Sequence, residues 1–254
     1  MRVSRTQLLF VGGFVLLVLG LWRVDASPQR IWEGLGKLGW LVALMWPPSP
    51  GQYLTDLLEA LAETVAMAFL GTLLAALIAL PICFLGAGNV VGNTLLRFTV
   101  RRSYDGLRGV DSLIWALIFV SAVGMGPFAG ILALAVPDIG LLAKVFSEAI
   151  ESADRRQVDG VRASGGSRLQ AIRYGLVPQA GPVMLSQVLY TFESNTRSAT
   201  ILGVVGAGGI GLALGDRIRL NDWDEAAFII LLILVTVAAI DWASRRIRLR
   251  LIRA

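Results

Sequence analysis

No charged residue occurs between Thr64 and Leu96, and this uncharged stretch limits the environments in which the chain can fold. About 20 apolar residues in a helix cross the roughly 30 Å hydrocarbon core of a bilayer, so the stretch is longer than one crossing needs. Similar apolar runs recur: residues of the AVILMFWYC class make up 56% of the chain, and charged residues only 16%. Soluble domains carry a larger charged fraction, so the sequence predicts an all-α integral membrane protein.

Turn and breaker residues divide the apolar sequence into about six membrane spans. Pro81 and Gly86 mark the end of the second span, and residues 124–127 supply a turn between the third and the fourth. The first run resembles a signal peptide as well, but no clean cleavage pattern follows it, so we expect a retained helix. Residues 31–46 are expected to form an interfacial helix or a re-entrant piece. The expected spans are residues 8–22, 57–86, 109–124, 127–147, 182–205 and 226–242.

The positions of Lys and Arg predict the orientation of these spans, because cytoplasmic connections are enriched in both residues. Most of the 23 Lys and Arg residues, 17 of them, fall in cytoplasmic connections or terminal segments when both termini are placed in the cytoplasm. The net charge of +5 therefore reflects topology, and we expect no nucleic-acid partner. We expect three parts: residues 1–55 with the first helix and a periplasmic or interfacial segment, 56–245 as the transmembrane core, and 246–254 as a basic cytoplasmic tail.

One cytoplasmic connection, residues 147–178, is far longer than neighbouring spans require. Helix-forming residues before Gly165 and after Ser167 predict two short helices with a glycine bend between them. Gly165 is expected to adopt a backbone conformation that a β-carbon opposes. A surface hairpin without a partner is the alternative interpretation of this segment.

The segment resembles the EAA loop found in permease subunits of bacterial ABC importers. Asp159 stands where that pattern has Glu, Gly160 and Val161 stand for its two Ala, and Gly165 for its Gly. Val177-Pro178 matches the closing Leu-Pro, whereas Gly175 stands where the family prefers Ile. Together with residues 147–152 and 192–211, the pattern is most similar to the permease of phosphonate importers.

The resemblance implies a type I ABC importer permease of MetI-like architecture in the bacterial inner membrane. It implies a homodimer that works with two cytoplasmic ABC ATPase subunits and a periplasmic phosphonate-binding protein. ATP and Mg would be bound by the ATPase, since this chain lacks the Gly-Lys-Ser/Thr of a P-loop. Within the loop, the residues implied to couple to the ATPase are Asp159, Gly160, Val161, Arg162, Ala163, Gly165 and Pro178.

Polar residues within the spans are candidates for the translocation path. Glu193 and Arg197 are one helical turn apart, Asn195 lies between them, and each charge is costly at mid-bilayer. An ion pair that fixes helix packing is the alternative role for the two charged residues. Asp138 follows Pro137, where we expect the fourth span to be interrupted, and it is either functional or part of a wet kink.

Other kinds of function find little support. The chain has no His and one Cys, Cys83, which excludes an internal disulfide and a His/Cys metal site. The glycines of residues 206–211 match a dinucleotide-binding pattern but follow no soluble strand, so we expect a bend at the outer end of the fifth span. The alternatives left open are a permease of the same family for phosphite, methionine or an organosulfonate, and an intramembrane enzyme using Glu193 or Asp138 as a base.

Overall fold

The computed structural model describes residues 5–24 and 26–253, and every regular element in these ranges is a helix. The chain divides into two compact units, residues 1–48 and 49–254, which are described separately. The first unit contains α1 (Arg5–Arg23) and α2 (Pro28–Leu44), the latter capped by Ser27, whose hydroxyl accepts a hydrogen bond from the Arg30 N–H at 3.3 Å. Residues 31–46, expected as an interfacial piece, are thus mostly helical, and their place relative to a membrane stays a prediction.

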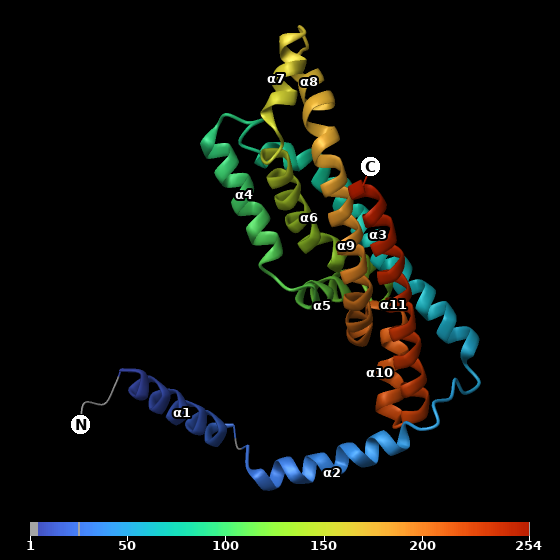
Figure 1. The fold of residues 1–254 in the computed structure, drawn as a ribbon. Coiled ribbons are helices and arrows are strands. Elements are labelled where there is room, and N and C mark those ends of the chain that lie inside the picture. Colours follow the sequence, from blue (N-terminus) through green and yellow to red (C-terminus); the bar gives the residue numbers. More distant parts are fainter. Residues whose placement is uncertain (1–4, 25, 254) are drawn as a thin grey trace. The chain divides into compact units, whose positions relative to one another are not determined.

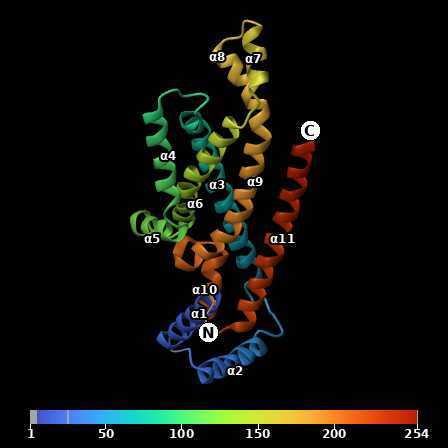
Figure 2. The ribbon, with the colours of Figure 1, turned by 60° about the vertical axis from the view of Figure 1, so that its left-hand side comes forward.

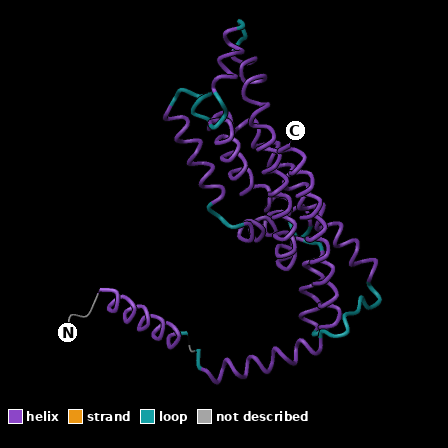
Figure 3. The backbone as a smooth tube through the Cα atoms, in the orientation of Figure 1, coloured by secondary structure: helices purple, strands orange, loops and turns teal. Residues whose placement is uncertain are grey.

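The second unit is a bundle of helices joined by short connections, most of them running roughly along one direction (Figures 1 and 2). Figure 3 shows how little of it is loop. Its elements, with η for π-helical segments, are α3 (Leu54–Gly86), α4 (Thr94–Arg108), α5 (Ser112–Val123), α6 (Pro127–Glu151), α7 (Arg155–Ala163), α8 (Arg168–Ala171), η1 (Ile172–Leu176), α9 (Val177–Leu202), η2 (Gly203–Ala207), α10 (Ile210–Leu220) and α11 (Trp223–Arg253).

Three described helices, α3, α6 and α11, are long and apolar enough to cross a bilayer. Two bent pairs raise that number to five if each pair counts as one span: α4 with α5, bent by 80°, and residues 168–207 with α10, bent by 61°. The expected first span, residues 8–22, lies in α1, whose described apolar part, Gly12–Arg23, is shorter than a crossing. The first span, and with it the total of six, therefore stays a prediction.

The structure corrects three expectations about the region that precedes and includes the third and fourth spans. The arginines of residues 97–108 were assigned to a connection, but they lie on α4, an amphipathic helix capped by the Asn93 side chain. The run 109–124 forms only the 12-residue α5, capped by Asp111. Pro137 was expected to interrupt the fourth span, yet α6 continues through it, as membrane helices tolerate when neighbouring groups satisfy the freed backbone.

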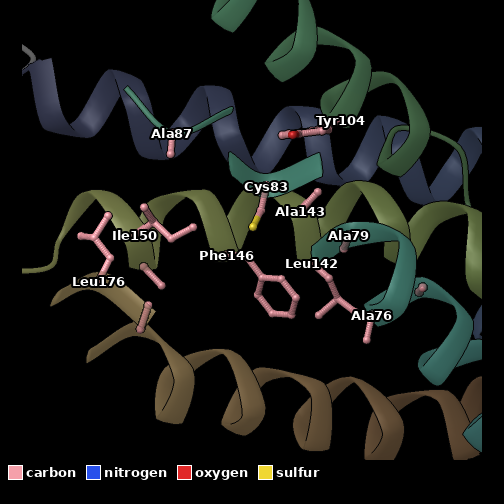
Figure 4. Close-up of a cluster of buried hydrophobic side chains, with 13 residues drawn as sticks. Ala76, Ala79, Cys83, Ala87, Tyr104, Leu142, Ala143, Phe146, Ile150 and Leu176 are labelled. Atoms are coloured by element: carbon pink, nitrogen blue, oxygen red, sulfur yellow. The ribbon is translucent and has the colours of Figure 1, made fainter. Parts of the chain in front are cut away.

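Small residues form much of the core between α3 and α6 (Figure 4). Ala75, Ala79 and Ala143 are fully buried there, and such residues let helix backbones approach closely in a membrane. The Ser147 hydroxyl on α6 donates to the Cys83 carbonyl at 2.7 Å. Tyr104 on α4 is likewise buried and donates to the Ile82 carbonyl at 2.6 Å, which anchors α4 to the bundle.

Candidate functional site: the α7–α8 elbow and the polar residues of α9

The long connection folds as the two expected short helices with a glycine bend, which we call the elbow (residues 154–176). Asp154 caps α7 by accepting a hydrogen bond from the Arg156 N–H at 2.9 Å. α7 ends at Ala163, Ser164 is its C-cap, and Gly165 follows with φ of +84°, a backbone conformation that favours glycine. The predicted bend at Gly165 is therefore confirmed.

The second half of the bend is fixed by local hydrogen bonds. The Gly166 N–H donates to the Val161 carbonyl at 3.0 Å, and a β-carbon at Gly166 would lie 2.6 Å from that oxygen. Ser167 then caps α8 through a reciprocal capping box, in which Gln170 accepts from the Ser167 N–H at 2.7 Å. These contacts define one geometry for the turn between α7 and α8.

The elbow is also fixed to the start of α9. Gln179 exchanges hydrogen bonds with the backbone of Asp154, accepting at 2.8 Å and donating at 3.2 Å. Gly175 lies directly beneath α7, since a β-carbon at Gly175 would be 2.9 Å from the Val158 Cα. This close approach explains why glycine stands where the resembling family prefers Ile: no larger side chain fits between α7 and η1.

A turn at residues 88–90, between α3 and α4, connects the elbow to the rest of the bundle. The Gly88 N–H donates to Glu151 at 2.6 Å, and the Asn89 side chain donates to the Ile150 carbonyl at 2.8 Å. Arg168 of α8 donates to the Val90 carbonyl. The sequence places this turn directly after the second expected span, and no local pattern relates it to the elbow.

The residues expected to couple to an ATPase lie at one end of the bundle, where α7 and α8 stand beyond the ends of α4 and α6 in Figures 1 and 2. No residue of α7 is buried. An exposed, internally braced pair of helices has the form that docking to another protein requires. The exposed members of the set are Asp159, Gly160, Arg162, Ala163, Gly165 and Pro178, whereas Val161 is half-buried.

Within the bundle, two of the four expected path residues come together. The buried Asn195 on α9 donates to Asp138 of α6 at 2.5 Å and to the Thr72 hydroxyl of α3 at 2.9 Å. These three residues, which we call the polar triad, join three helices. A cavity of about 200 Å³ adjoins it, lined in part by Arg108, Asp111, Ser112, Ser194 and Ser198.

The other two path residues lie elsewhere on α9. Glu193 pairs with Arg197 at 3.4 Å, the pair that the sequence predicts, and also with Arg248 of α11 at 3.0 Å. Residues 193 and 195 are about 200° apart around a helix, so Glu193 and Asn195 face different neighbours. The contact with Arg248 was missed, because residue 248 is expected at the start of a cytoplasmic tail and spacing alone does not relate it to α9.

The glycine-rich stretch after α9 forms the expected bend. Gly206, Gly208 and Gly209 all have positive φ, and the helix axis turns by 61° before α10. The Ile210 N–H donates to the Thr64 hydroxyl at 2.8 Å, which fixes the start of α10 against α3. A β-carbon at Gly211 would lie 1.9 Å from the Thr200 carbonyl, so helix packing requires this glycine.

Comparison with known proteins agrees with this arrangement. A family profile described as "Binding-protein-dependent transport system inner membrane component" matches residues 71–253. The chain is 35% identical to the phosphite transport system permease protein PtxC of Stutzerimonas stutzeri, over 92% of this chain and 86% of PtxC. It is 38% identical to the phosphate-import permease protein PhnE of Mycolicibacterium smegmatis, over 95% of this chain and 44% of PhnE.

Among solved structures, the chain is similar to one of the MetNI methionine ABC transporter in an inward-facing conformation. The TM-score is 0.69 at 23% sequence identity, covering 80% of this chain and 99% of the solved chain. At this identity the likeness concerns the fold alone.

Proposed function

This chain belongs to the family of binding-protein-dependent transport system inner membrane components, and from that premise we propose that it is the permease subunit of an ATP-driven importer for phosphonate or a related phosphorus oxyanion. As a member of a transport permease family, it is not itself an enzyme. The relatives named for phosphite and phosphate transport support small tetrahedral phosphorus oxyanions as the substrate class. Methionine and organosulfonates are the less favoured alternatives.

The observation that carries the coupling part of the proposal is the braced elbow at the start of α9. α7 rests on η1 at Gly175, and Gln179 binds the residue that caps α7. A displacement of α7 by a partner would therefore move the start of α9 as well. About 30 Å farther along the same helix, at 1.5 Å per residue, Asn195 holds the polar triad.

We infer that an ATPase seated against the elbow uses this connection to alternate the permease between outward- and inward-open states. The polar triad and the Glu193–Arg197 pair are the proposed polar features of the translocation path. The same hydrogen bonds and ion pairs between helices are also what we expect if these residues only hold the helices together. Transport measurements on variants decide between these roles.

The proposed assembly follows the family. It contains two copies of this chain, two cytoplasmic ATPase subunits that bind ATP and Mg, and a periplasmic binding protein that delivers the oxyanion. This chain binds no cofactor in the proposal. It lies in the bacterial inner membrane with both termini in the cytoplasm and with residues 56–245 as the transport core.

The test reconstitutes the assembled complex in lipid vesicles and measures ATP hydrolysis stimulated by methylphosphonate, phosphite and phosphate in the presence of the binding protein. Asp159→Lys should abolish the stimulation while the chain still assembles in the membrane, because the reversed charge lies on the exposed face of α7. Arg156→Ala, which removes one charge from an exposed residue of the same helix outside the predicted coupling set, is the control. Normal stimulation in Asp159→Lys would refute the coupling role, and stimulation by methionine alone would refute the substrate class.

A further inference from the structure

The elbow lines a cavity, and two of the lining residues, Asp159 and Arg162, also belong to the predicted coupling set. The cavity has a volume of about 350 Å³ and lies between α7, α8 and the turn at residues 88–90. This volume falls at the lower end of the range typical of small-molecule sites. Three arginines and one carboxylate line it: Arg155, Asp159 and Arg162 from α7, and Arg168 from α8.

The charges in this cavity do not balance. Arg155, Asp159 and Arg162 are four and three residues apart, so they share one face of α7. Asp159 is the only carboxylate of α7, and the nearby Glu151 already accepts from Arg101 at 2.7 Å and from the Gly88 N–H at 2.6 Å. Three guanidinium groups therefore face one carboxylate.

No carboxylate other than Asp159 lines the cavity in the described part of the chain. Arg168 donates to the Val90 carbonyl, which is a neutral acceptor, and no ion pair of Arg155 or Arg162 occurs among the described residues. Guanidinium groups present fixed pairs of N–H donors that match the oxygen spacing of phosphate-type anions. The cavity thus offers an anion both net positive charge and suitable donors.

We propose that this cavity binds a phosphorus oxyanion on the side of the membrane where the elbow lies. Arg155 and Arg162 supply the charge, Arg168 joins α8 to the turn beneath, and the bound anion ties α7 to residues 88–90. The identity of the anion rests on the proposed function, since an importer of phosphorus oxyanions releases its product on that side. Occupancy restrains the elbow and so reports product accumulation to the coupling machinery.

The first experiment titrates inorganic phosphate into the full chain in nanodiscs of phosphatidylcholine, followed by calorimetry. Arg155→Gln/Arg162→Gln should weaken phosphate binding at least about tenfold, because two charge-assisted contacts are removed. The matched control is Arg156→Gln/Arg173→Gln, which removes the same charge from exposed residues outside the cavity lining. This control should change the affinity for phosphate by less than about threefold, because it removes only long-range electrostatic attraction.

A lipid headgroup carries the same phosphate chemistry, and a second arm separates the two sources. The thermal unfolding temperature of the chain is compared between nanodiscs that contain phosphatidylglycerol and nanodiscs of phosphatidylcholine alone. Phosphate binding in phosphatidylcholine discs assigns the site to the free ion. The site is assigned to the headgroup if phosphate does not bind and phosphatidylglycerol raises the unfolding temperature. This rise must be lost only in the Arg155→Gln/Arg162→Gln variant.

Three results would each overturn the proposal. In the first, neither ligand acts on the original chain, and in the second, both double variants lose binding equally. A third is that Arg155→Gln/Arg162→Gln only weakens co-purification of the ATPase, which would make the cavity part of that interface. Measurements of substrate uptake test the proposed function separately from the anion site. Failed import with normal phosphate binding would count against the proposed function alone, and normal import without phosphate binding against this site alone.

Discussion

Asn195→Ala combined with Asp138→Ala in a double-mutant cycle tests whether the polar triad couples α6 and α9. The Asn195 amide is buried, 5% exposed, and lies 2.5 Å from the Asp138 carboxylate. The two residues belong to different helices, α9 and α6, and meet through their side chains. A specific interaction should therefore appear as non-additivity of the two single changes.

The expected magnitude follows from the chemistry of the contact. Hydrogen bonds to charged groups contribute about 1.5–3 kcal/mol in soluble proteins. Contacts between membrane helices average only about 0.6 kcal/mol, with a maximum near 1.7 kcal/mol. Because Asp138 can carry a charge, we expect a coupling free energy of about 1.5 kcal/mol, or roughly tenfold in the unfolding equilibrium. The single change Asn195→Ala should cost more, since the contact with Thr72 at 2.9 Å is lost as well.

The assay is reversible unfolding of the purified chain in mixed micelles by titration with SDS, followed by tryptophan fluorescence. The control cycle pairs Asp138→Ala with Thr196→Val, because the Thr196 hydroxyl donates only within α9, to Phe192 at 3.0 Å. That pair should be additive within about 0.5 kcal/mol. A coupling below about 0.5 kcal/mol for Asn195 and Asp138 would refute the reasoning, and the triad would then be an incidental contact.

Three further changes test other contacts. Gly175→Ala should destabilise the packing of α7 on η1 by about 1–3 kcal/mol, because its β-carbon would lie 2.9 Å from the Val158 Cα. Limited proteolysis between α7 and α9 should therefore become faster. Gly165→Ala should also make this proteolysis faster, because an alanine at φ +84° carries backbone strain of about 1–3 kcal/mol. Glu193→Gln should lower the unfolding free energy by about 1–3 kcal/mol, because the half-buried Arg248 loses its carboxylate partner.

Matched controls accompany these three changes. Gly160→Ala places a β-carbon where nothing lies within 4 Å, so it should leave proteolysis unchanged or slow it by favouring α7. Asp241→Asn removes the partner of Arg245 from a pair in which that arginine is 67% exposed, so it should cost less than about 1 kcal/mol. Proteolysis as fast in Gly160→Ala as in Gly175→Ala, or equal losses for Asp241→Asn and Glu193→Gln, would contradict the assigned contacts.

Local patterns in the sequence predicted the features that depend on neighbouring residues. The elbow has its bend at Gly165 and its cap at Ser167 because backbone preference and capping act over a few residues. The Glu193–Arg197 pair was predicted for the same reason, since helix geometry alone brings residues four apart together. The apolar runs predicted the all-helical membrane class, whereas the MetI-like architecture was implied by the resemblance to ABC importer permeases.

Contacts between distant segments could not be predicted in this way. The sequence predicts a connection at α4 because four of its 15 residues are arginines, yet buried Tyr104 and the pair of Arg101 with Glu151 fix it to the bundle. Its fold depends on residues of α3 and α6 that no local pattern relates to it. The meeting of Asn195 with Asp138 depends likewise on how helices from separate parts of the chain approach each other.

The π-helical turn that precedes α9 gives this helix a second possible register. A π-helical turn holds about one residue more than the α-helical turn it replaces, and here such a turn occurs at residues 172–176, whereas residues 203–207 form a kink at Gly206. Conversion of residues 172–176 to α-helix would advance the register by one residue and rotate α9 by about 100° without unfolding it. Such a screw-like step would carry Asn195 away from α3 and α6 and present a different side of α9 to them.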